Sequence, residues 1–148
     1  MLIKFNENEI TKISKEVINR ILKMDNTKAK VITLSGDLGA GKTTLTKELA
    51  KQFGIKENIL SPTFVIMKIY NINSNSKYYS HFKKFIHIDA YRLDSSEELL
   101  KIGWDKLIND KDNLIFIEWP EKVIECIDNT NFKITLSHVD NENRLIEF

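Results

Sequence analysis

The chain contains little cysteine, proline or glycine: one Cys, two Pro and five Gly in 148 residues. Because Cys126 is the single thiol, a disulfide within the chain is excluded and a cysteine-based metal site lacks a second ligand. An excess of one charge is also lacking, since 22 Lys and Arg face 21 Asp and Glu and leave a net charge of +1. That balance gives no bulk electrostatic argument for binding nucleic acid or a membrane surface.

Long hydrophobic runs are missing as well. None is longer than Leu114–Ile117, against the roughly 18 apolar residues that are needed to cross a bilayer. Met1–Glu7 shows no cationic start followed by an apolar block, so no signal peptide is predicted. We expect a cytoplasmic protein without membrane contact, folded as a single domain, 1–148.

One segment of this glycine-poor chain uses glycine in a defined pattern. Gly36–Thr43 reads G-D-L-G-A-G-K-T, a complete G-x-x-x-x-G-K-[ST] phosphate-binding loop. Val31–Leu34 before it is predicted to be a buried strand, and Thr44–Phe53 after it has the apolar spacing of a helix that ends at Gly54. A strand, the loop and a helix in that order are the setting that phosphate binding requires.

The residue types in the loop match the chemistry of phosphate binding. Gly36 and Gly41 permit tight turns that bring backbone N–H groups against phosphate oxygens at the positive end of the helix. Lys42 is expected to reach the β- and γ-phosphates, and the Thr43 hydroxyl is expected to bind Mg²⁺. The predicted nucleotide-binding residues are consecutive: Gly36, Asp37, Leu38, Gly39, Ala40, Gly41, Lys42, Thr43 and Thr44.

The rest of the pattern predicts an α/β fold, a P-loop NTPase sandwich whose central sheet is mixed, largely parallel and flanked by helices. Apolar positions from Ile10 to Leu22 predict a helix capped by Asn8 or Thr11. The polar stretch Asn71–Lys84 is expected to be either a long surface hairpin or a loose loop. Further strands are expected at 2–5, 63–70, 85–89 and 114–118, a helix at 96–108 with a break near 103, and a C-terminal hairpin at 132–138 and 144–148.

Two acidic residues end predicted buried strands. Asp89 follows Phe85–Ile88, and Glu118 follows Leu114–Ile117. Because the carboxyl ends of parallel strands face the ligand crevice of an open α/β sheet, both acids are expected near the phosphate loop. They are candidates for binding Mg²⁺ and for orienting the attacking water, and the residues alone do not assign the two roles.

The choice of nucleotide rests on two further absences. The [NT]-K-x-D element that reads guanine is missing, which favours ATP over GTP. Arginine is scarce, with Arg20, Arg92 and Arg144 only, so no segment supplies the arginine-rich lid of a small-molecule kinase. We expect an ATPase that turns over slowly until a partner supplies or positions a cationic group.

A few other residues are candidates for the site. Thr63, in S-P-T, follows the helix of the phosphate loop, where many such enzymes carry a mobile threonine that senses the γ-phosphate. Trp119 directly follows Glu118 and is a candidate for the site or an interface, whereas Trp104 is expected in the core. His87 alternates with Asp89 along one strand, so both side chains are expected on the same face.

The motifs G-D-L-G-A-G-K-T-T, S-P-T-F, H-I-D-A-Y-R-L, E-E-L and I-E-W-P-E occur in this order along the chain. Together they resemble the TsaE family, small ATPases of bacterial tRNA threonylcarbamoyladenosine biosynthesis. The resemblance implies that Lys42 binds phosphate, that Thr43 and Glu118 bind Mg²⁺, and that Asp89 is a catalytically important aspartate that also serves as a candidate metal ligand. It further implies a switch-like role for Thr63, an activity-related role for Trp119, and an adenine pocket around Asn6–Thr11 and the hairpin near Asn143.

The resemblance also implies partners. A protein of this family binds the TsaB–TsaD heterodimer, in which TsaD transfers the threonylcarbamoyl group to adenosine 37 of tRNA, so tRNA is contacted only indirectly. ATP binding and hydrolysis with Mg²⁺ then permit repeated turnover. Two other functions stay open: a nucleotide-dependent scaffold without essential hydrolysis, and a small-molecule kinase.

Overall fold

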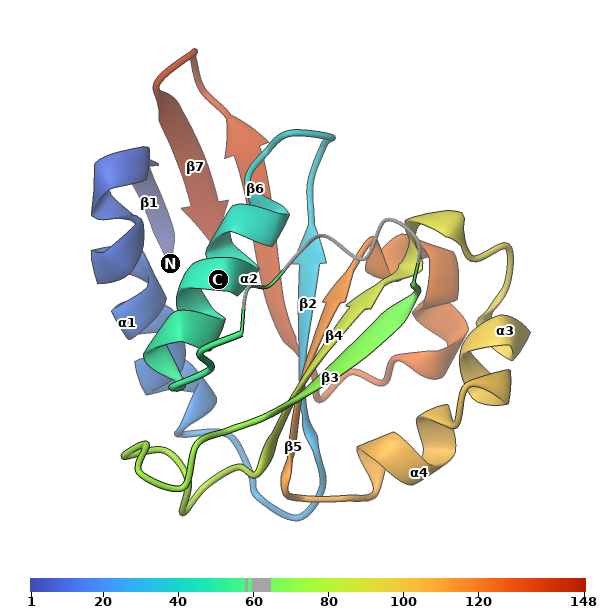
Figure 1. The fold of residues 1–148 in the computed structure, drawn as a ribbon. Coiled ribbons are helices and arrows are strands. Elements are labelled where there is room, and N and C mark those ends of the chain that lie inside the picture. Colours follow the sequence, from blue (N-terminus) through green and yellow to red (C-terminus); the bar gives the residue numbers. More distant parts are fainter. Residues whose placement is uncertain (58, 60–64) are drawn as a thin grey trace.

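A computed structural model describes residues 1–57, 59 and 65–148. Its centre is a seven-stranded sheet in the order β1-β7-β6-β2-β5-β4-β3, with helices packed on both faces (Figure 1). The strands are β1 (Leu2–Asn6), β2 (Lys30–Ser35), β3 (Met67–Asn71), β4 (Lys84–Asp89), β5 (Asn113–Glu118), β6 (Phe132–His138) and β7 (Asn143–Glu147). The helices are η1 (Glu7–Glu9), α1 (Ile10–Ile21), α2 (Lys42–Gln52), η2 (Ala90–Arg92), α3 (Ser96–Lys101), α4 (Trp104–Ile108) and η3 (Pro120–Cys126).

Strand direction divides the sheet into a parallel centre and antiparallel edges. β6, β2, β5 and β4 run parallel to one another, whereas β7, β1 and β3 pair antiparallel with their neighbours. The predicted α/β class, with a mixed, largely parallel sheet between helices, is confirmed. The parallel register places Glu118 beside both Leu34 and Asp89, so the carboxyl ends of β2, β5 and β4 lie together.

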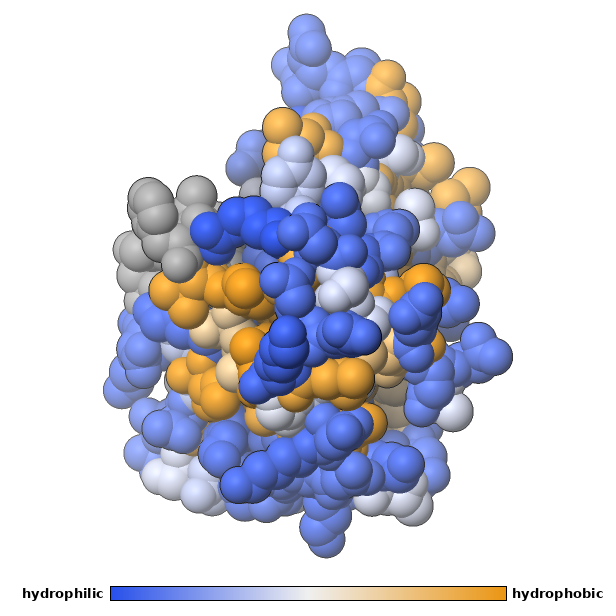
Figure 2. Space-filling model, turned by 90° about the vertical axis from the view of Figure 1, so that its right-hand side faces the viewer, coloured by the Kyte–Doolittle hydropathy of each residue, from blue (hydrophilic) through white to orange (hydrophobic). Residues whose placement is uncertain are grey.

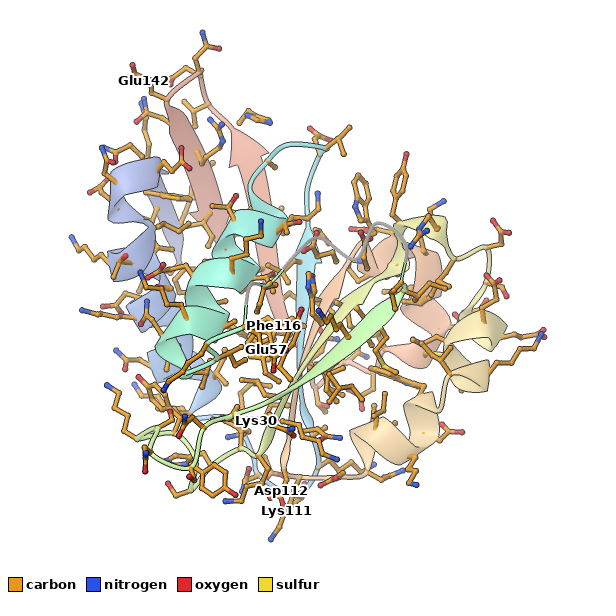
Figure 3. The ribbon with its side chains drawn as sticks, viewed as in Figure 1. Lys30, Glu57, Lys111, Asp112, Phe116 and Glu142 are labelled. Atoms are coloured by element: carbon orange, nitrogen blue, oxygen red, sulfur yellow. The ribbon has the colours of Figure 1, made fainter. Side chains whose placement is uncertain are left out.

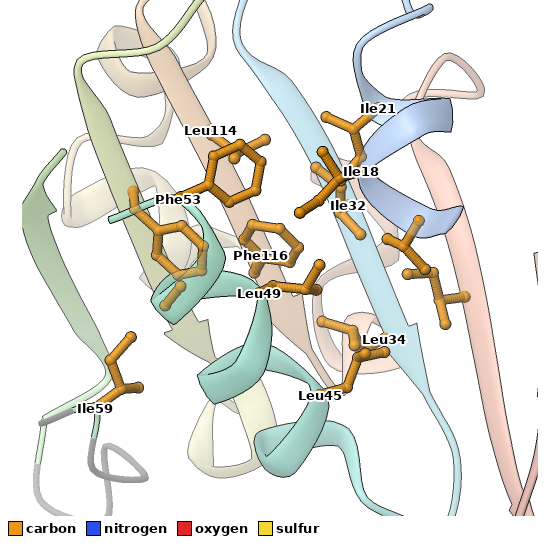
Figure 4. Close-up of a cluster of buried hydrophobic side chains, with 14 of the residues drawn as sticks. Ile18, Ile21, Ile32, Leu34, Leu45, Leu49, Phe53, Ile59, Leu114 and Phe116 are labelled. Carbon is orange, nitrogen blue, oxygen red and sulfur yellow. The ribbon is translucent and has the colours of Figure 1, made fainter. Parts of the chain in front are cut away.

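One hydrophobic core fills the space between the sheet and the helices α1 and α2 (Figure 4). The face of α1 that carries Ile18 and Ile21 packs toward β2, and Leu45, Leu49 and Phe53 of α2 pack toward β2 and β5. The rings of Phe85 and Phe116 stack with centroids 4.6 Å apart in the same layer. Truncating a buried phenylalanine such as Phe116 to alanine typically costs about 3–5 kcal/mol.

A second core lies on the opposite face, under α3, α4 and η3. Trp104 is 2% exposed there, and its indole N–H donates to the carbonyl of Cys126 at 3.1 Å. The predicted core position of Trp104 is therefore confirmed. Figure 2 looks at this side of the molecule and shows hydrophobic residues in a broken band across its middle, with hydrophilic residues above and below.

Three local expectations need correction or qualification. The N-terminal helical segment is capped by Asn6 rather than by Asn8 or Thr11, because the Asn6 side chain accepts from the Asn8 N–H and Glu9 binds the Asn6 N–H in return. Within the described part of the predicted strand 63–70, regular pairing begins only at Met67. The polar segment between β3 and β4 is built of turns, but it is anchored in the core through Phe82, which is fully buried and lies 5.9 Å from Phe53.

Candidate nucleotide-binding site

The phosphate loop leaves β2 in a conformation that depends on glycine. Gly36 has φ 137°, Gly39 has φ 78° and Gly41 has φ 103°, values that residues with a Cβ adopt at a cost. At Gly36 the backbone also passes close to β6, because an added Cβ would lie 2.1 Å from the carbonyl oxygen of Leu136. The sequence pattern thus corresponds to two physical requirements, positive φ along the loop and close approach at its start.

Lys42 starts α2 and turns back over the loop. The residue is 5% exposed, and its ammonium donates to the carbonyl oxygens of Gly36 and Asp37, the latter at 2.9 Å. Burial lowers the pKa of Lys42, while the carboxylates of Glu118, then of Glu121, Asp89 and Asp37, oppose that shift. The ammonium is held inside the loop by these two carbonyl oxygens.

Thr43 and Glu118 are in direct contact, although 75 residues separate them in the sequence. The Thr43 hydroxyl donates to Glu118 Oε2 at 2.9 Å. Glu118 itself is 3% exposed, and its other oxygen, Oε1, lies 2.8 Å from Nε2 of the fully buried His87. Two oxygen donors predicted to bind Mg²⁺ thus meet at the loop.

The Thr43 and Glu118 donors fit a magnesium ion. A hydroxyl and a carboxylate are hard oxygen ligands, and Mg²⁺ is usually held by one or two protein oxygens together with phosphates and water. Among the described residues, no three His, Cys, Asp or Glu side chains cluster as a metal cage would need. Thr43 and Glu118 are the protein oxygens that would hold such an ion.

Asp89 lies beside Glu118 in the strand register. Its carboxylate Oδ1 accepts from the Tyr91 N–H at 3.0 Å and so caps the short helix η2. The expectation that Asp89 and Glu118 share one edge of the sheet is confirmed by that register, whereas their roles in binding metal or orienting water stay predictions.

Trp119 covers the lysine from the other side. Its ring centroid lies 4.1 Å from the Lys42 ammonium and 5.0 Å from the ring of Tyr91. Trp119 has φ 59° and ψ 52°, the single positive φ outside glycine among the described residues. A bulky residue in this region is strained, so the backbone turn that follows Glu118 is held in a costly conformation that places the indole over the loop.

Two cavities meet at the phosphate loop. The phosphate-side cavity, of about 430 Å³, is lined by Leu38, Gly39, Gly41, Lys42, Thr43, Thr44, Asp89, Tyr91, Arg92, Glu118 and Trp119. The hairpin-side cavity, of about 450 Å³, is lined by Phe5, Asn6, Glu7, Asn8, Ile10, Gly39, Ala40, Gly41, Thr44, Asn141, Glu142 and Arg144. Figure 3 shows Glu142 at the tip of the β6–β7 hairpin and Lys30, Lys111 and Asp112 toward the other end of the sheet.

The hairpin-side cavity lies where the adenine pocket is expected, against the N-terminal segment and the hairpin tip. The structure also adds residues that the sequence reasoning did not place in the site. Tyr91 and Arg92 line the phosphate-side cavity, and the signal for them was available in the motif that contains Asp89. Thr63 lies outside the described residues, so its predicted role stays a prediction.

Comparison with known proteins agrees with these motifs. The family profile described as threonylcarbamoyl adenosine biosynthesis protein TsaE matches residues 5–146. The tRNA threonylcarbamoyladenosine biosynthesis protein TsaE of Rickettsia felis is 35% identical over 98% of this chain and 77% of its own length. That of Haemophilus influenzae is 31% identical over 95% of this chain and 83% of its own length.

The fold comparison gives the same result. The crystal structure of Bacillus subtilis YdiB superposes with a TM-score of 0.67 at 26% identity, over 99% of this chain and 83% of that one. No helix in the described ranges is long and apolar enough to cross a membrane.

Proposed function

The chain belongs to the TsaE family of tRNA threonylcarbamoyladenosine biosynthesis, and from this premise we propose that it is a P-loop ATPase that binds and hydrolyses Mg-ATP. In this proposal the hydrolysis supports threonylcarbamoylation of adenosine 37 in tRNA through a complex with TsaB- and TsaD-type proteins in the cytoplasm. A role in that biosynthesis follows from membership of the family, and we propose the ATPase activity and the partners in addition.

The observation that carries the proposal is the contact between Thr43 and Glu118. It joins the end of the phosphate loop to the end of β5 and puts two Mg²⁺-type oxygen donors 2.9 Å apart. Lys42 lies in the same cavity, with its ammonium on loop carbonyls that phosphate oxygens would replace as partners. Bound Mg²⁺ would supply charge neutralisation between the β- and γ-phosphates, and Thr43 and Glu118 would hold it.

Slow intrinsic turnover fits the arrangement of the cationic groups. Lys42 is bound by Asp37 O and lies beneath the Trp119 ring, so binding nucleotide requires these contacts to rearrange. Such a rearrangement is a step that a protein partner docked near the site can favour. We therefore expect a low basal rate that rises when TsaB and TsaD are present.

The test is ATP hydrolysis by the purified protein, alone and with its cognate TsaB and TsaD, in Mg²⁺, with Lys42→Ala as the control. A slow basal rate that increases severalfold with the partners and is lost in the control supports the proposal. Binding of ATP without any stimulation of hydrolysis favours the scaffold function instead. Transfer of phosphate to a small molecule, rather than its release, points to a kinase.

A further inference from the structure

His87 is a buried polar residue to which the phosphate-binding motif and the predicted roles of Asp89 and Glu118 assign no function. It sits in the middle of β4 and is 0% exposed, on the sheet face that also carries Phe85 and Phe116. An apolar side chain is the usual occupant of such a position, since burying an imidazole is favourable only when its nitrogens find partners. Its contacts therefore indicate why a histidine is there.

The single hydrogen bond of the ring goes to the candidate metal ligand. His87 Nε2 lies 2.8 Å from Glu118 Oε1, and among the described residues the other nitrogen, Nδ1, has no partner. A carboxylate accepts hydrogen bonds and does not donate them, so Nε2 carries the proton when Glu118 is ionised. The imidazole thus leaves one nitrogen unsatisfied and keeps the contact with Glu118.

Because of that contact, the two carboxylate oxygens of Glu118 have different partners. Oε1 is occupied by His87 from inside the core, whereas Oε2 faces the Thr43 hydroxyl at the edge of the cavity. The register explains why His87 can reach: it stands opposite Phe116, two residues before the pair Asp89 and Glu118, and on the same face. The histidine therefore reaches Glu118 diagonally across the two paired strands.

We propose that His87 is a positioning residue that holds Glu118 with only Oε2 presented to the metal, and that it thereby sets the affinity of the nucleotide-bound site for Mg²⁺. The proposal rests on the proposed function, because it concerns the metal bound with the nucleotide. Groups that hydrogen-bond to a metal ligand from behind fix its orientation, and their loss commonly weakens metal binding about 10- to 100-fold. His87 does not touch the nucleotide in this assignment.

A matched pair of substitutions tests whether a hydrogen-bond donor at position 87 must reach Glu118. In His87→Gln the amide nitrogen takes the place of Nε2 and can still donate to Glu118, whereas in His87→Asn the shorter amide reaches only the place of Nδ1. Both variants bury a neutral amide at the same position. A general effect of burying an amide is therefore shared by the two, and the reach to Glu118 differs.

The measurement is a titration of Mg²⁺ into each variant saturated with a fluorescent, non-hydrolysable ATP analogue, beside analogue binding in EDTA. We expect analogue binding in EDTA to be unchanged in both variants. We expect His87→Asn to weaken the apparent Mg²⁺ affinity roughly 10- to 100-fold and His87→Gln to stay within a few-fold of the unsubstituted protein. Equal Mg²⁺ affinity in the Asn and Gln variants overturns the proposal.

A double-mutant cycle with Glu118 distinguishes positioning of the carboxylate from a purely structural effect of the substitution at His87. With Glu118→Ala already in place, His87→Asn should cause no further loss of Mg²⁺ affinity, because the group it positions is gone. An additive loss overturns the proposal. The unsubstituted protein is measured first. If it binds the analogue equally with and without Mg²⁺, the proposed function fails, independently of the result for His87.

Discussion

Each end of the parallel strands has a cavity of similar size, but the polar side chains at the two cavities form different hydrogen bonds. At the carboxyl ends the phosphate-side cavity measures about 430 Å³, and at the amino ends a cavity of about 370 Å³ lies between Met24–Val31, Trp104 and Cys126–Asn131. Cavity volume alone therefore does not distinguish the candidate nucleotide site from the cavity at the opposite end.

The difference lies in whether an acidic side chain takes part in the long-range hydrogen bonds. At the phosphate-side cavity, Thr43 bonds to Glu118 across 75 residues and His87 to Glu118 across 31. At the opposite cavity the acidic side chains bond locally, Asp25 to Thr27 and Asp128 to Thr130, each across two residues. The long-range bond there, from Thr33 to Asn131 across 98 residues, joins two neutral side chains. Local bonds of that kind close turns, whereas charged groups brought together from distant strands need a whole fold to hold them, as a functional site does.

The largest expected contrast compares two lysines, one at each cavity. We predict that Lys42→Ala lowers ATP hydrolysis at least about 100-fold, because the cation that stabilises the transferring phosphoryl charge is lost. Lys28→Ala, at the opposite cavity, should leave the rate unchanged. Phosphate release under saturating Mg-ATP measures both variants. A comparable loss in the Lys28 variant would remove the distinction between the two ends.

A second contrast uses two glycines with positive φ. Gly36→Ala places a Cβ 2.1 Å from the Leu136 carbonyl oxygen, whereas at Gly103 (φ 93°), between α3 and α4, no atom lies within 4 Å of the added Cβ. Gly103→Ala should cost about 1–2 kcal/mol of unfolding free energy from the left-handed conformation alone. Gly36→Ala carries the same kind of strain plus a clash with backbone and should cost more.

Urea unfolding of the two alanine variants gives the comparison directly. Because Gly36 lies in the loop, its alanine variant should also lose nucleotide affinity, while the Gly103 variant should retain it. Equal destabilisation in both would mean that β6 gives way and that the close approach at Leu136 is not a constraint.

The phosphate loop and its two acids could be predicted from the sequence because both follow from short-range rules. A loop motif encodes its own turn, and a buried parallel strand that ends on an acid places that acid at the ligand edge. The contact of His87 with Glu118 could not be predicted in this way. The alternation of side chains along a strand placed His87 on the same face as Asp89, but whether its ring reaches Glu118 depends on the order of the strands and on side-chain rotamers.

Two other features needed the tertiary structure. The hairpin-side cavity is lined by the N-terminal segment, the phosphate loop and the β6–β7 turn, which the pairing of β1 with β7 and of β2 with β6 brings together. The polar stretch Asn71–Lys84 was predicted to be a long surface hairpin or a loose loop, yet the rings of Phe82 and Tyr78 pack on Phe53 with centroids 5.9 Å and 4.9 Å away. A few aromatic residues in a polar stretch anchored it where composition alone predicted a surface.

A third contrast compares the two tryptophans. Trp119 lies over Lys42 at the phosphate-side cavity, and Trp104 lines the opposite one. We predict that nucleotide binding changes the fluorescence of Trp119 and not that of Trp104, because only the Lys42–Trp119 contact must rearrange. Trp119→Phe should abolish the signal and change nucleotide affinity about 2- to 30-fold, the range of one cation–π contact.

Trp104→Phe is the matched control for that measurement. It should keep the nucleotide-dependent fluorescence change and lose some stability, because the hydrogen bond from Trp104 Nε1 to the Cys126 carbonyl disappears. A nucleotide signal that survives in the Trp119 variant and vanishes in the Trp104 variant would reverse the assignment of the two ends.

The smallest expected effect is at the local turn of the opposite cavity. Hydrogen bonds from the Thr130 side chain and backbone lower the pKa of the exposed Asp128. A carboxylate with a lowered folded pKa adds stability above its unfolded pKa, and that stability is lost as the pH falls through the folded pKa.

Asp128→Ala should therefore cost less than about 1 kcal/mol of unfolding free energy at neutral pH, since the group is exposed and screened. The charge-dependent part of the cost should disappear in acid, as urea unfolding at both pH values will show, while nucleotide affinity at neutral pH stays unchanged. A loss of that affinity would show that the two ends are coupled and that the opposite cavity is more than a closed turn.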